Sequence, residues 1–338
     1  MRVVVTGASG NVGTALLRRL AADGHDAVGI SRRRPADEPP FAGVPWHQID
    51  VGSRAAPAAL TEAMRGADAV VHLAWMIQPS HDREAMRRAN QDGSRAVLSA
   101  VRASGVGHLI HMSSVGAYSP AEQGMCVDES WPCDGVPTSY YSVDKAAVEH
   151  LLDTVAPDEF TLSRVRPTLI LQPGAASEIA RYFLGPLLPM KAVRPRVMRL
   201  MPWPKALCVQ FVHSDDVADA VMRILLDRIP GAFNVAADPV IDRTTYRETL
   251  GGVGPSVPCA VLGVGADITW RLRLQPTAKG WVDMGTRLPL MDTTRLRGIG
   301  WQPQHSGTET LRSFVDAMQH GEGDQGPLLR AKPKVFAR

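Results

Sequence analysis

The amino-acid sequence predicts an α/β fold, a doubly wound parallel sheet with helices on both faces. Short apolar runs alternate with stretches of helical periodicity over residues 1–165, which is typical of a parallel sheet covered on both faces. A glycine-rich turn follows the first apolar run, Val3–Val5, and an apolar helix around Leu16 follows the turn. This order of strand, turn and helix is the one that nucleotide-binding α/β folds use.

The positions of the expected strands and helices follow from the apolar runs and from apolar residues at helical spacing. The longest helix is expected over Asp82–Ala103, where apolar residues recur with helical spacing. Asn90 lies on the edge of that stripe and needs a buried partner, which an ordinary core position would also provide. The expected strands are Val3–Val5, Ala27–Ile30, Trp46–Ile49, Ala69–Leu73, Leu109–Met112 and Thr161–Val165.

The regular alternation ends after Arg166-Pro167, and this sets the expected domains. One further strand, helix and strand of the sheet domain are expected between Phe211 and Val235. We therefore expect a nucleotide-binding domain from residues 1–170 and 211–238. A smaller, discontinuous C-terminal substrate-binding lobe would comprise residues 171–210 and 239–320, and residues 321–338, rich in glycine and basic at the end, would form a flexible tail.

Composition narrows the class of protein. A chain of 338 residues that is 45% hydrophobic can bury a large core, and a net charge of +3 gives no general attraction to nucleic acid. No apolar run approaches the ~18 residues that span a membrane, and no signal peptide is visible, so a cytoplasmic location is expected. The four cysteines lack zinc-binding spacing, so no metal site is expected.

The glycine-rich turn reads Thr6-Gly7-Ala8-Ser9-Gly10-Asn11-Val12-Gly13. Gly7 permits a tight turn, Gly10 lets the backbone approach a pyrophosphate, and Gly13 lets the helix pack close to the strand. The helix N-terminus then offers N–H groups to the phosphates. The turn therefore predicts a dinucleotide site.

A tyrosine and a lysine four residues apart, Tyr141 and Lys145, would lie on one face of a helix. A free tyrosine titrates near ~10 and exchanges protons poorly at neutral pH unless a cation stabilises its phenolate. Lys145 is placed to do so. The same spacing also occurs by chance on solvated helix faces, so its weight depends on the rest of the sequence.

Taken together, these motifs resemble a known family, the extended short-chain dehydrogenase/reductases, often called the NAD-dependent epimerase/dehydratase family. That family spaces its glycines as Gly7, Gly10 and Gly13 are spaced, and carries Tyr-x-x-x-Lys. The similarity continues, in the expected order, through His111–Tyr118, Arg166-Pro167, Phe211–Ala218 and Asp292–Pro303. The resemblance implies a Rossmann-type fold, and it is compatible with a homodimer formed through two helices per subunit.

The resemblance also implies catalytic roles for three residues. Ser114 would orient a substrate carbonyl oxygen, and Tyr141 would be the acid in reduction and the base in oxidation. Lys145 would lower the pKa of Tyr141 and bind the nicotinamide ribose. Ser113 is the alternative to Ser114, although strand alternation turns the two to opposite faces.

The type of cofactor depends on the end of the second strand, which reads Ser31-Arg32-Arg33-Arg34 and has no carboxylate before Asp37. Arginine can bind a 2′-phosphate, whereas an acidic residue there would select NAD. We therefore expect NADP(H) to be preferred over NAD(H), the competing interpretation being a solvated surface run. The expected cofactor-binding residues are Gly7, Ser9, Gly10, Asn11, Val12, Gly13, Ser31, Arg32, Arg33, Asp50, Val51, Leu73, Ala74, Trp75, Asn90, Met112, Lys145, Pro167 and Thr168.

The reaction is less well determined. Sugar dehydratases of the family carry an Asp-Glu pair after the hydroxyl residue, where this chain has Val115-Gly116. The expected lobe is rich in apolar residues, which suits an apolar or aromatic substrate. Six basic residues between Glu178 and Asp215 could instead hold a diphosphate: Arg181, Lys191, Arg194, Arg196, Arg199 and Lys205.

We predict an NADP(H)-dependent ketoreductase or alcohol dehydrogenase that acts on a hydrophobic small-molecule carbonyl, in a pathway such as secondary metabolism. Two alternatives stay open at this point. One is a nucleotide-sugar epimerase or reductase, and the other is a non-catalytic NADP-sensing protein of the same fold.

Overall fold

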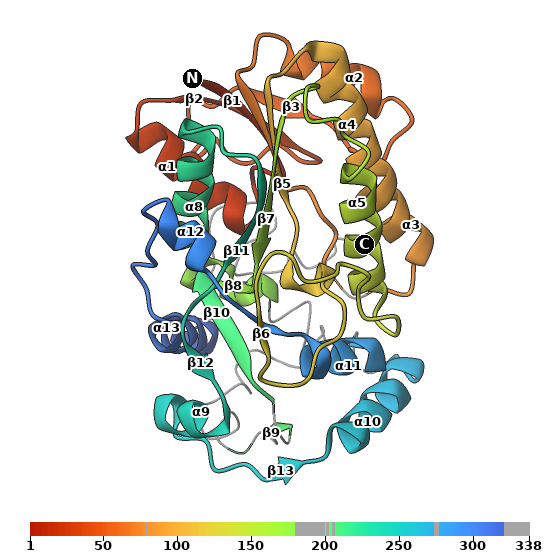
Figure 1. The fold of residues 1–338 in the computed structure, drawn as a ribbon, viewed down its shortest axis with the longest axis vertical. Helices are drawn as coiled ribbons and strands as arrows, with labels where there is room; N and C mark the ends of the chain where they lie inside the picture. Colours follow the sequence, from red (N-terminus) through yellow and green to blue (C-terminus); the bar gives the residue numbers. More distant parts are fainter. Residues whose placement is uncertain (79, 180–199, 201–202, 205–206, 274–276, 321–338) are drawn as a thin grey trace.

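A computed structural model describes the chain except for residues 79, 180–199, 201–202, 205–206, 274–276 and 321–338 (Figure 1). The expected tail and the six basic residues listed above lie outside the described residues. The central sheet has seven parallel strands in the order β11-β7-β5-β4-β1-β2-β3. The predicted doubly wound parallel sheet is confirmed. Its strands are β1 (Arg2–Thr6), β2 (Asp26–Ser31), β3 (Trp46–Gln48), β4 (Ala69–His72), β5 (His108–Met112), β7 (Thr161–Pro167) and β11 (Gly231–Val235).

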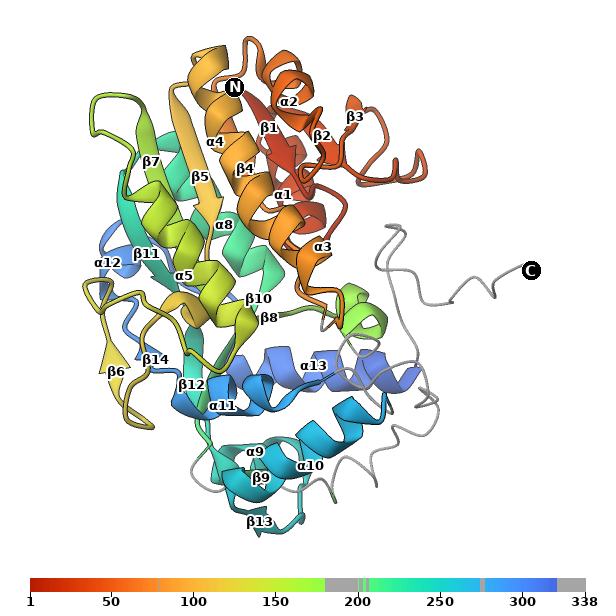
Figure 2. The ribbon, with the colours of Figure 1, turned by 90° about the vertical axis from the view of Figure 1, so that its right-hand side faces the viewer.

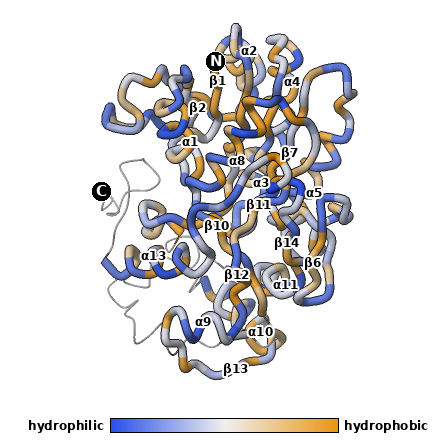
Figure 3. The backbone as a smooth tube through the Cα atoms, turned by 60° about the vertical axis from the view of Figure 1, so that its left-hand side comes forward, coloured by the Kyte–Doolittle hydropathy of each residue, from blue (hydrophilic) through white to orange (hydrophobic). Residues whose placement is uncertain are grey.

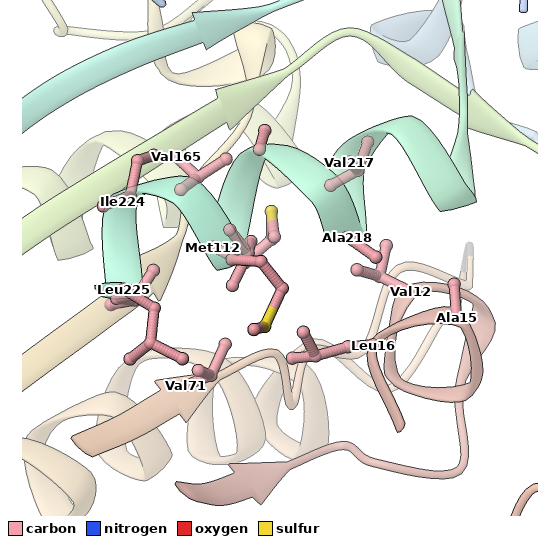
Figure 4. Packing of buried hydrophobic residues seen from close by; sticks show 14 of the residues in the cluster. Val12, Ala15, Leu16, Val71, Met112, Val165, Val217, Ala218, Ile224 and Leu225 are labelled. Atoms are coloured by element: carbon pink, nitrogen blue, oxygen red, sulfur yellow. The ribbon is translucent and has the colours of Figure 1, made fainter. Parts of the chain in front are cut away.

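Helices cover both faces of this sheet. On one face α1 (Asn11–Ala22) packs against α8 (Ser214–Leu226), and on the other lie α2 (Ala56–Met64), α4 (Gly93–Ser104) and α5 (Tyr140–Leu152). Figure 4 shows the first layer, in which side chains of both helices meet apolar side chains from the sheet. Val3, Val5, Val71 and Ile110 are fully buried there. Both faces are thus closed, as the apolar strands predict.

The predicted helix Asp82–Ala103 is interrupted. It consists of α3 (Arg83–Arg87), a π-helical segment η1 (Arg88–Asp92) and α4. π-helical turns are rare and occur mostly at functional sites. The turn buries Asn90, whose side-chain oxygen accepts from the Met76 amide at 2.7 Å and whose nitrogen donates to the Met76 carbonyl at 3.2 Å. Asn90 therefore fixes the segment that follows β4.

The strand expected at Phe211 does not join the central sheet, which corrects the prediction. This strand, β10 (Val209–His213), pairs in parallel with β8 (Leu169–Leu171) and antiparallel with β12 (Ala237–Ile241) in a separate sheet. Only α8 and β11 return to the central sheet. Helix α13 (Gly307–His320) packs over the second sheet through an apolar cluster around Phe314. An apolar run alone does not tell which sheet a strand joins.

Most of the remaining elements lie beyond the carboxyl ends of the central strands (Figures 1, 2 and 3), whereas α12 (Thr294–Gly298) packs beside β11. α10 (Cys259–Arg271) and α11 (Lys279–Arg287) pack on each other at this end. None of the helices in the described part of the chain is both long and apolar enough to cross a membrane. The other short elements are β6 (Cys126–Val127) paired with β14 (Leu290–Met291), β9 (Trp203–Pro204) paired with β13 (Ser256–Val257), η2 (Val115–Ala117), η3 (Pro173–Ala175) and α9 (Arg243–Leu250).

Candidate active site

A cavity of about 580 Å³ lies at the carboxyl ends of β1, β2, β4 and β5 and reaches toward α11. In doubly wound sheets ligands bind at this edge, where the strand order reverses. Every residue predicted to be catalytic or to bind cofactor lines the cavity except Asn90. Asn90 is placed one layer behind, holding the backbone of the lining residue Met76.

The glycine-rich turn is held by contacts that leave no room for side chains. Gly7 has φ +71°, and a Cβ there would lie 2.8 Å from the Ala74 amide nitrogen. A Cβ on Gly13 would lie 2.4 Å from the Gly7 carbonyl oxygen. Gly10 is the N-cap of α1, and no side chain caps that helix. The helix N-terminus is therefore open to the cavity, and this geometry fits the diphosphate of a dinucleotide.

The arginines after β2 lie at the outer end of the cavity. Ser31 Oγ donates to the Arg33 carbonyl at 2.6 Å, and Gln48 Nε2 donates to the Arg32 carbonyl at 3.1 Å. Both arginine side chains are exposed and line the cavity. The carboxylate of Asp50, nearby in the lining, accepts from the Gly52 amide at 3.1 Å.

The group expected to be catalytic comes together at the start of α5. Ser139 caps this helix by accepting from the Ser142 amide, which places Tyr141 in the first turn. The Ser114 side chain hydrogen bonds to Tyr141. Ser113, the alternative, donates instead to the buried carboxylate of Glu149 at 2.5 Å. Of the two serines, Ser114 is the one in contact with Tyr141.

The structure differs from the prediction on how Tyr141 is tuned. Burial raises the pKa of Tyr141 to about 12, and the hydrogen bond to Ser114 opposes this. The Lys145 ammonium is directed elsewhere. Its Nζ donates to the Met112 carbonyl at 2.9 Å and lies 3.6 Å from the centre of the Trp75 ring. Burial lowers the pKa of Lys145 to about 7, an effect that Glu149 partly offsets.

Glu149 was not expected from the sequence. It follows Lys145 by one helical turn and accepts from Arg166 Nε at 2.8 Å and Nη2 at 3.0 Å. Desolvation opposes ionisation, yet these bonds and the Ser113 bond hold the pKa of Glu149 below its usual value. The signal was available, because residues four apart share a helix face. Glu149 gives the buried Lys145 its nearby negative charge.

Two buried histidines behind the cavity were also missed. His72 on β4 has its Nδ1 2.7 Å from Thr6 Oγ1 and its Nε2 3.1 Å from Ser94 Oγ. Burial, with a smaller effect of Lys145, lowers its pKa to about 3. His111 on β5 lies near it, with ring centres 5.3 Å apart and the rings tilted by 47°, and burial lowers the pKa of His111 well below the usual value. Both rings are neutral at pH 7.

The inner end of the cavity is apolar. Trp281 on α11 lies with its ring centre 5.2 Å from that of Tyr141, and its Nε1 donates to the Tyr140 hydroxyl at 3.2 Å. Beyond Thr168 the described part of the lining contains one charged residue, Glu178. The apolar residues of this end are Trp75, Met76, Ile77, Ile179, Trp281, Val282, Met284, Leu288, Pro289 and Leu290.

A family model described as the NAD dependent epimerase/dehydratase family matches residues 3–236. The chain belongs to this family. It has the Rossmann-like fold of that family. The resemblance expected from Gly7, Gly10, Gly13, Tyr141 and Lys145 is confirmed at the level of the family.

Relatives at about 30% identity carry reductase names. Ceramide reductase of Caulobacter vibrioides is 28% identical over 74% of this chain and 68% of its own length. The 2-alkyl-3-oxoalkanoate reductase of Stenotrophomonas maltophilia is 28% identical over 92% of this chain and 98% of its own. An uncharacterized protein of Mycobacterium tuberculosis is 32% identical over 94% of this chain, but the chain spans only 30% of that protein's length.

Solved structures of family members share the fold. Thermus thermophilus UDP-glucose 4-epimerase, solved with NAD, superposes with a TM-score of 0.68. The match covers 94% of this chain and 99% of the epimerase, at 21% identity.

Proposed function

We propose that the chain is an NADPH-dependent ketoreductase that reduces a hydrophobic small-molecule carbonyl. The observation that carries this proposal is the composition of the cavity around Tyr141. Ser114 and Tyr141 are adjacent polar residues of the lining, and the walls around them are aromatic and aliphatic. Such a lining buries an apolar substrate and leaves its carbonyl oxygen to the two hydroxyls.

Ser114, Tyr141 and Lys145 would have separate roles in the protonation of that oxygen. The reduced nicotinamide, when bound, supplies the hydride. Ser114 donates a hydrogen bond to the carbonyl oxygen, which gains negative charge as the carbon is reduced. Tyr141 gives its proton to that oxygen. Because burial holds the pKa of Tyr141 at about 12, the phenolate left behind requires a cation, and Lys145 is the nearest candidate along α5.

Trp75 has to move for Lys145 to act in this way. The indole covers the ammonium at 3.6 Å, and the buried Trp75 Nε1 has no hydrogen-bond partner among the described residues. A buried N–H without a partner costs about 1–3 kcal/mol. Moving the indole aside would relieve that cost and free Lys145 for the ribose hydroxyls and the phenolate.

We further propose that NADPH is preferred over NADH. Arg32 and Arg33 would bind the 2′-phosphate, with Ser31 holding the turn between them. Planar guanidinium groups form charge-assisted bonds with phosphate. The turn Gly7–Gly13 would hold the diphosphate, and Asp50 and Val51 would lie beside the adenine.

A screen of carbonyl compounds that follows NADPH absorbance tests the proposal. Long-chain 3-oxo acids, alkyl ketones and aromatic ketones should be reduced, and UDP-sugars should neither be turned over nor raise the melting temperature. Conversion of a UDP-sugar with tightly bound NAD would instead identify an epimerase. Turnover of no compound, together with NADPH binding, would indicate an NADP sensor.

A further inference from the structure

Helix α10 presents an apolar stripe to solvent. Val261, Val264, Ile268 and Leu272, which continues from its C-terminal end, are exposed by 59%, 57%, 53% and 64%. Their spacing of three, four and four residues places them on one side of the helix. We call these four residues the α10 stripe.

The orientation of α10 is the reverse of that of an ordinary surface helix, which turns its polar side outward. The inward side already has partners. Trp270 stacks on His81 with ring centres 4.3 Å apart, and Gly263 lies against Lys279 of α11. The acidic residue of the helix, Asp267, is paired with Arg271 at 2.9 Å. The outward side therefore carries apolar surface that no contact inside α10 accounts for.

The size and charge of the stripe favour a lipid surface over a second copy of the chain. A helix of 13 residues is about 20 Å long, so a stripe one side chain wide offers roughly 200 Å². Stable protein interfaces bury about 800 Å² on each partner. Arg271 and Arg273 are exposed at the C-terminal end of the stripe, and Lys279, also exposed, lies beside Gly263 of the same helix. Apolar residues flanked by cations are the pattern of helices that lie in the interface of anionic bilayers.

α10 lies one helix away from the cavity, because it packs on α11, whose residues line it. Trp281, Val282 and Gly285 of α11, the helix packed on α10, line the apolar end. On the other side, His81 beneath Trp270 follows the lining residues Ile77 and Gln78. In Figure 2, α10 and α11 lie together at the end of the molecule away from the central sheet. A surface in contact with the stripe would thus be next to the inner end of the cavity.

We propose that the α10 stripe docks on the surface of a bilayer containing anionic headgroups, and that an apolar substrate dissolved in that bilayer enters the cavity beside α10 and α11. Docking rests on the exposed stripe and on the basic residues beside it, and does not depend on the proposed reductase function. The passage of substrate rests on the proposed reductase function.

Vesicle flotation of the full chain tests docking without catalysis, using phosphatidylcholine vesicles with and without phosphatidylglycerol. The double variant Val264→Glu/Ile268→Glu should lose at least tenfold in partitioning, because each side chain loses the gain of burial and adds a charge. Leu226→Glu, which changes an exposed leucine of α8 (50% exposed) outside the stripe, should bind like the unmodified chain. Arg273→Gln/Lys279→Gln should reduce binding to the anionic vesicles alone, by about fivefold per cation.

Equal flotation of the double variant and the unmodified chain would overturn docking, as would failure of the unmodified chain to float. If sedimentation shows that the double variant converts a dimer to a monomer, the stripe is an interface between copies and the proposal is wrong. Turnover of a water-soluble ketone separates the two proposals. It should be unchanged in the double variant, and its absence in the unmodified chain would refute the reductase function while leaving the flotation result intact.

Discussion

In the outer half of the cavity, where the cofactor is proposed to bind, close contacts between backbone atoms set the geometry. In the inner half, where the substrate is proposed to bind, large apolar side chains set it. The outer half comes from the turn Gly7–Gly13 and the ends of neighbouring strands, and the inner half combines segments as distant as Trp75 and Trp281. The outer half therefore leaves no room for a side chain at Gly7 or Gly13. The inner half can change its shape when one apolar side chain replaces another.

Tyr141 stands where the halves meet, and its change to Phe should have the largest effect. Removing the proton donor should lower kcat by about a thousandfold, within the range for general acid catalysis. Affinity for NADPH, measured by fluorescence titration, should stay within about twofold, because binding depends on the outer half. Residual turnover above a tenth of the original would refute the assigned role.

Acid should destabilise the fold around His72 and His111, the two buried histidines behind the cavity. Because the pKa of His72 is about 3 when folded and near ~6.5 when unfolded, the unfolded chain takes up a proton between these values that the folded chain refuses. Stability is therefore present above pH ~6.5 and lost as the pH falls toward ~3, by roughly 3 kcal/mol at about pH 4.5.

Urea unfolding at about pH 7 and 4.5 measures this loss, and His111→Leu should reduce it because the pKa of His111 is also lowered by burial. His150→Gln, at a ring 57% exposed, should leave it unchanged. A loss of the same size in all three proteins would show that other groups control the acid response.

The same substitution in each half gives a direct comparison. Gly13→Ala places a Cβ 2.4 Å from the Gly7 carbonyl oxygen, so we expect a loss of about 2 kcal/mol in unfolding free energy and weaker NADPH binding. Gly285→Ala, in α11 with no atom within 4 Å of its Cβ, should raise stability by about 0.5–1 kcal/mol. Equal effects would remove the distinction between the halves.

At the outer end, Arg32→Ala tests the cofactor preference. We expect NADPH to bind the unmodified chain at least about tenfold more tightly than NADH, a difference of ~1.4 kcal/mol, because Arg32 is proposed to pair with the 2′-phosphate. The variant should bind both alike, as isothermal titration would show. Equal affinities before the change would refute the preference.

Trp75→Leu should have the smallest effect, and of opposite sign. Covering a buried ammonium contributes up to ~2 kcal/mol, which the cofactor has to overcome when it reaches Lys145. Removing the indole should tighten NADPH binding by about fivefold in the same titration. Weaker binding would show that the indole contacts the cofactor directly.

Sequence periodicity predicted the central sheet well because its inner strands, such as β1, β4 and β5, are buried on both faces. The run Val3–Val5 became β1 (Arg2–Thr6), and the glycine turn followed where expected. Sequence periodicity could not predict features that depend on pairing between distant segments. β10 pairs in the second sheet, although its residues Phe211 and Val212 have the apolar pattern of a central strand. The contact of Trp75 with Lys145 joins residues that are seventy positions apart in the sequence.

Among the site residues, too, the sequence predicted what local rules determine and missed what distant contacts determine. The common location of the site residues follows from the rule that parallel strands end at one edge. Asn90 lies behind the cavity because the π-helical segment η1, which an apolar stripe does not reveal, turns its side chain toward the Met76 backbone. Glu149 was missed because its importance comes from Arg166, on a strand that packs against α5 only in the folded chain.

The position of Gly116 next to Tyr141 leaves no room for a larger residue. A Cβ at that position would lie 2.8 Å from Cε1 of Tyr141, so even alanine would press on the proton donor. Sugar dehydratases of the family place the second acid of their Asp-Glu pair at the corresponding position. A single mutation toward that chemistry would disturb the tyrosine before the new carboxylate could help. An acidic residue at this position therefore requires Tyr141 or α5 to shift first.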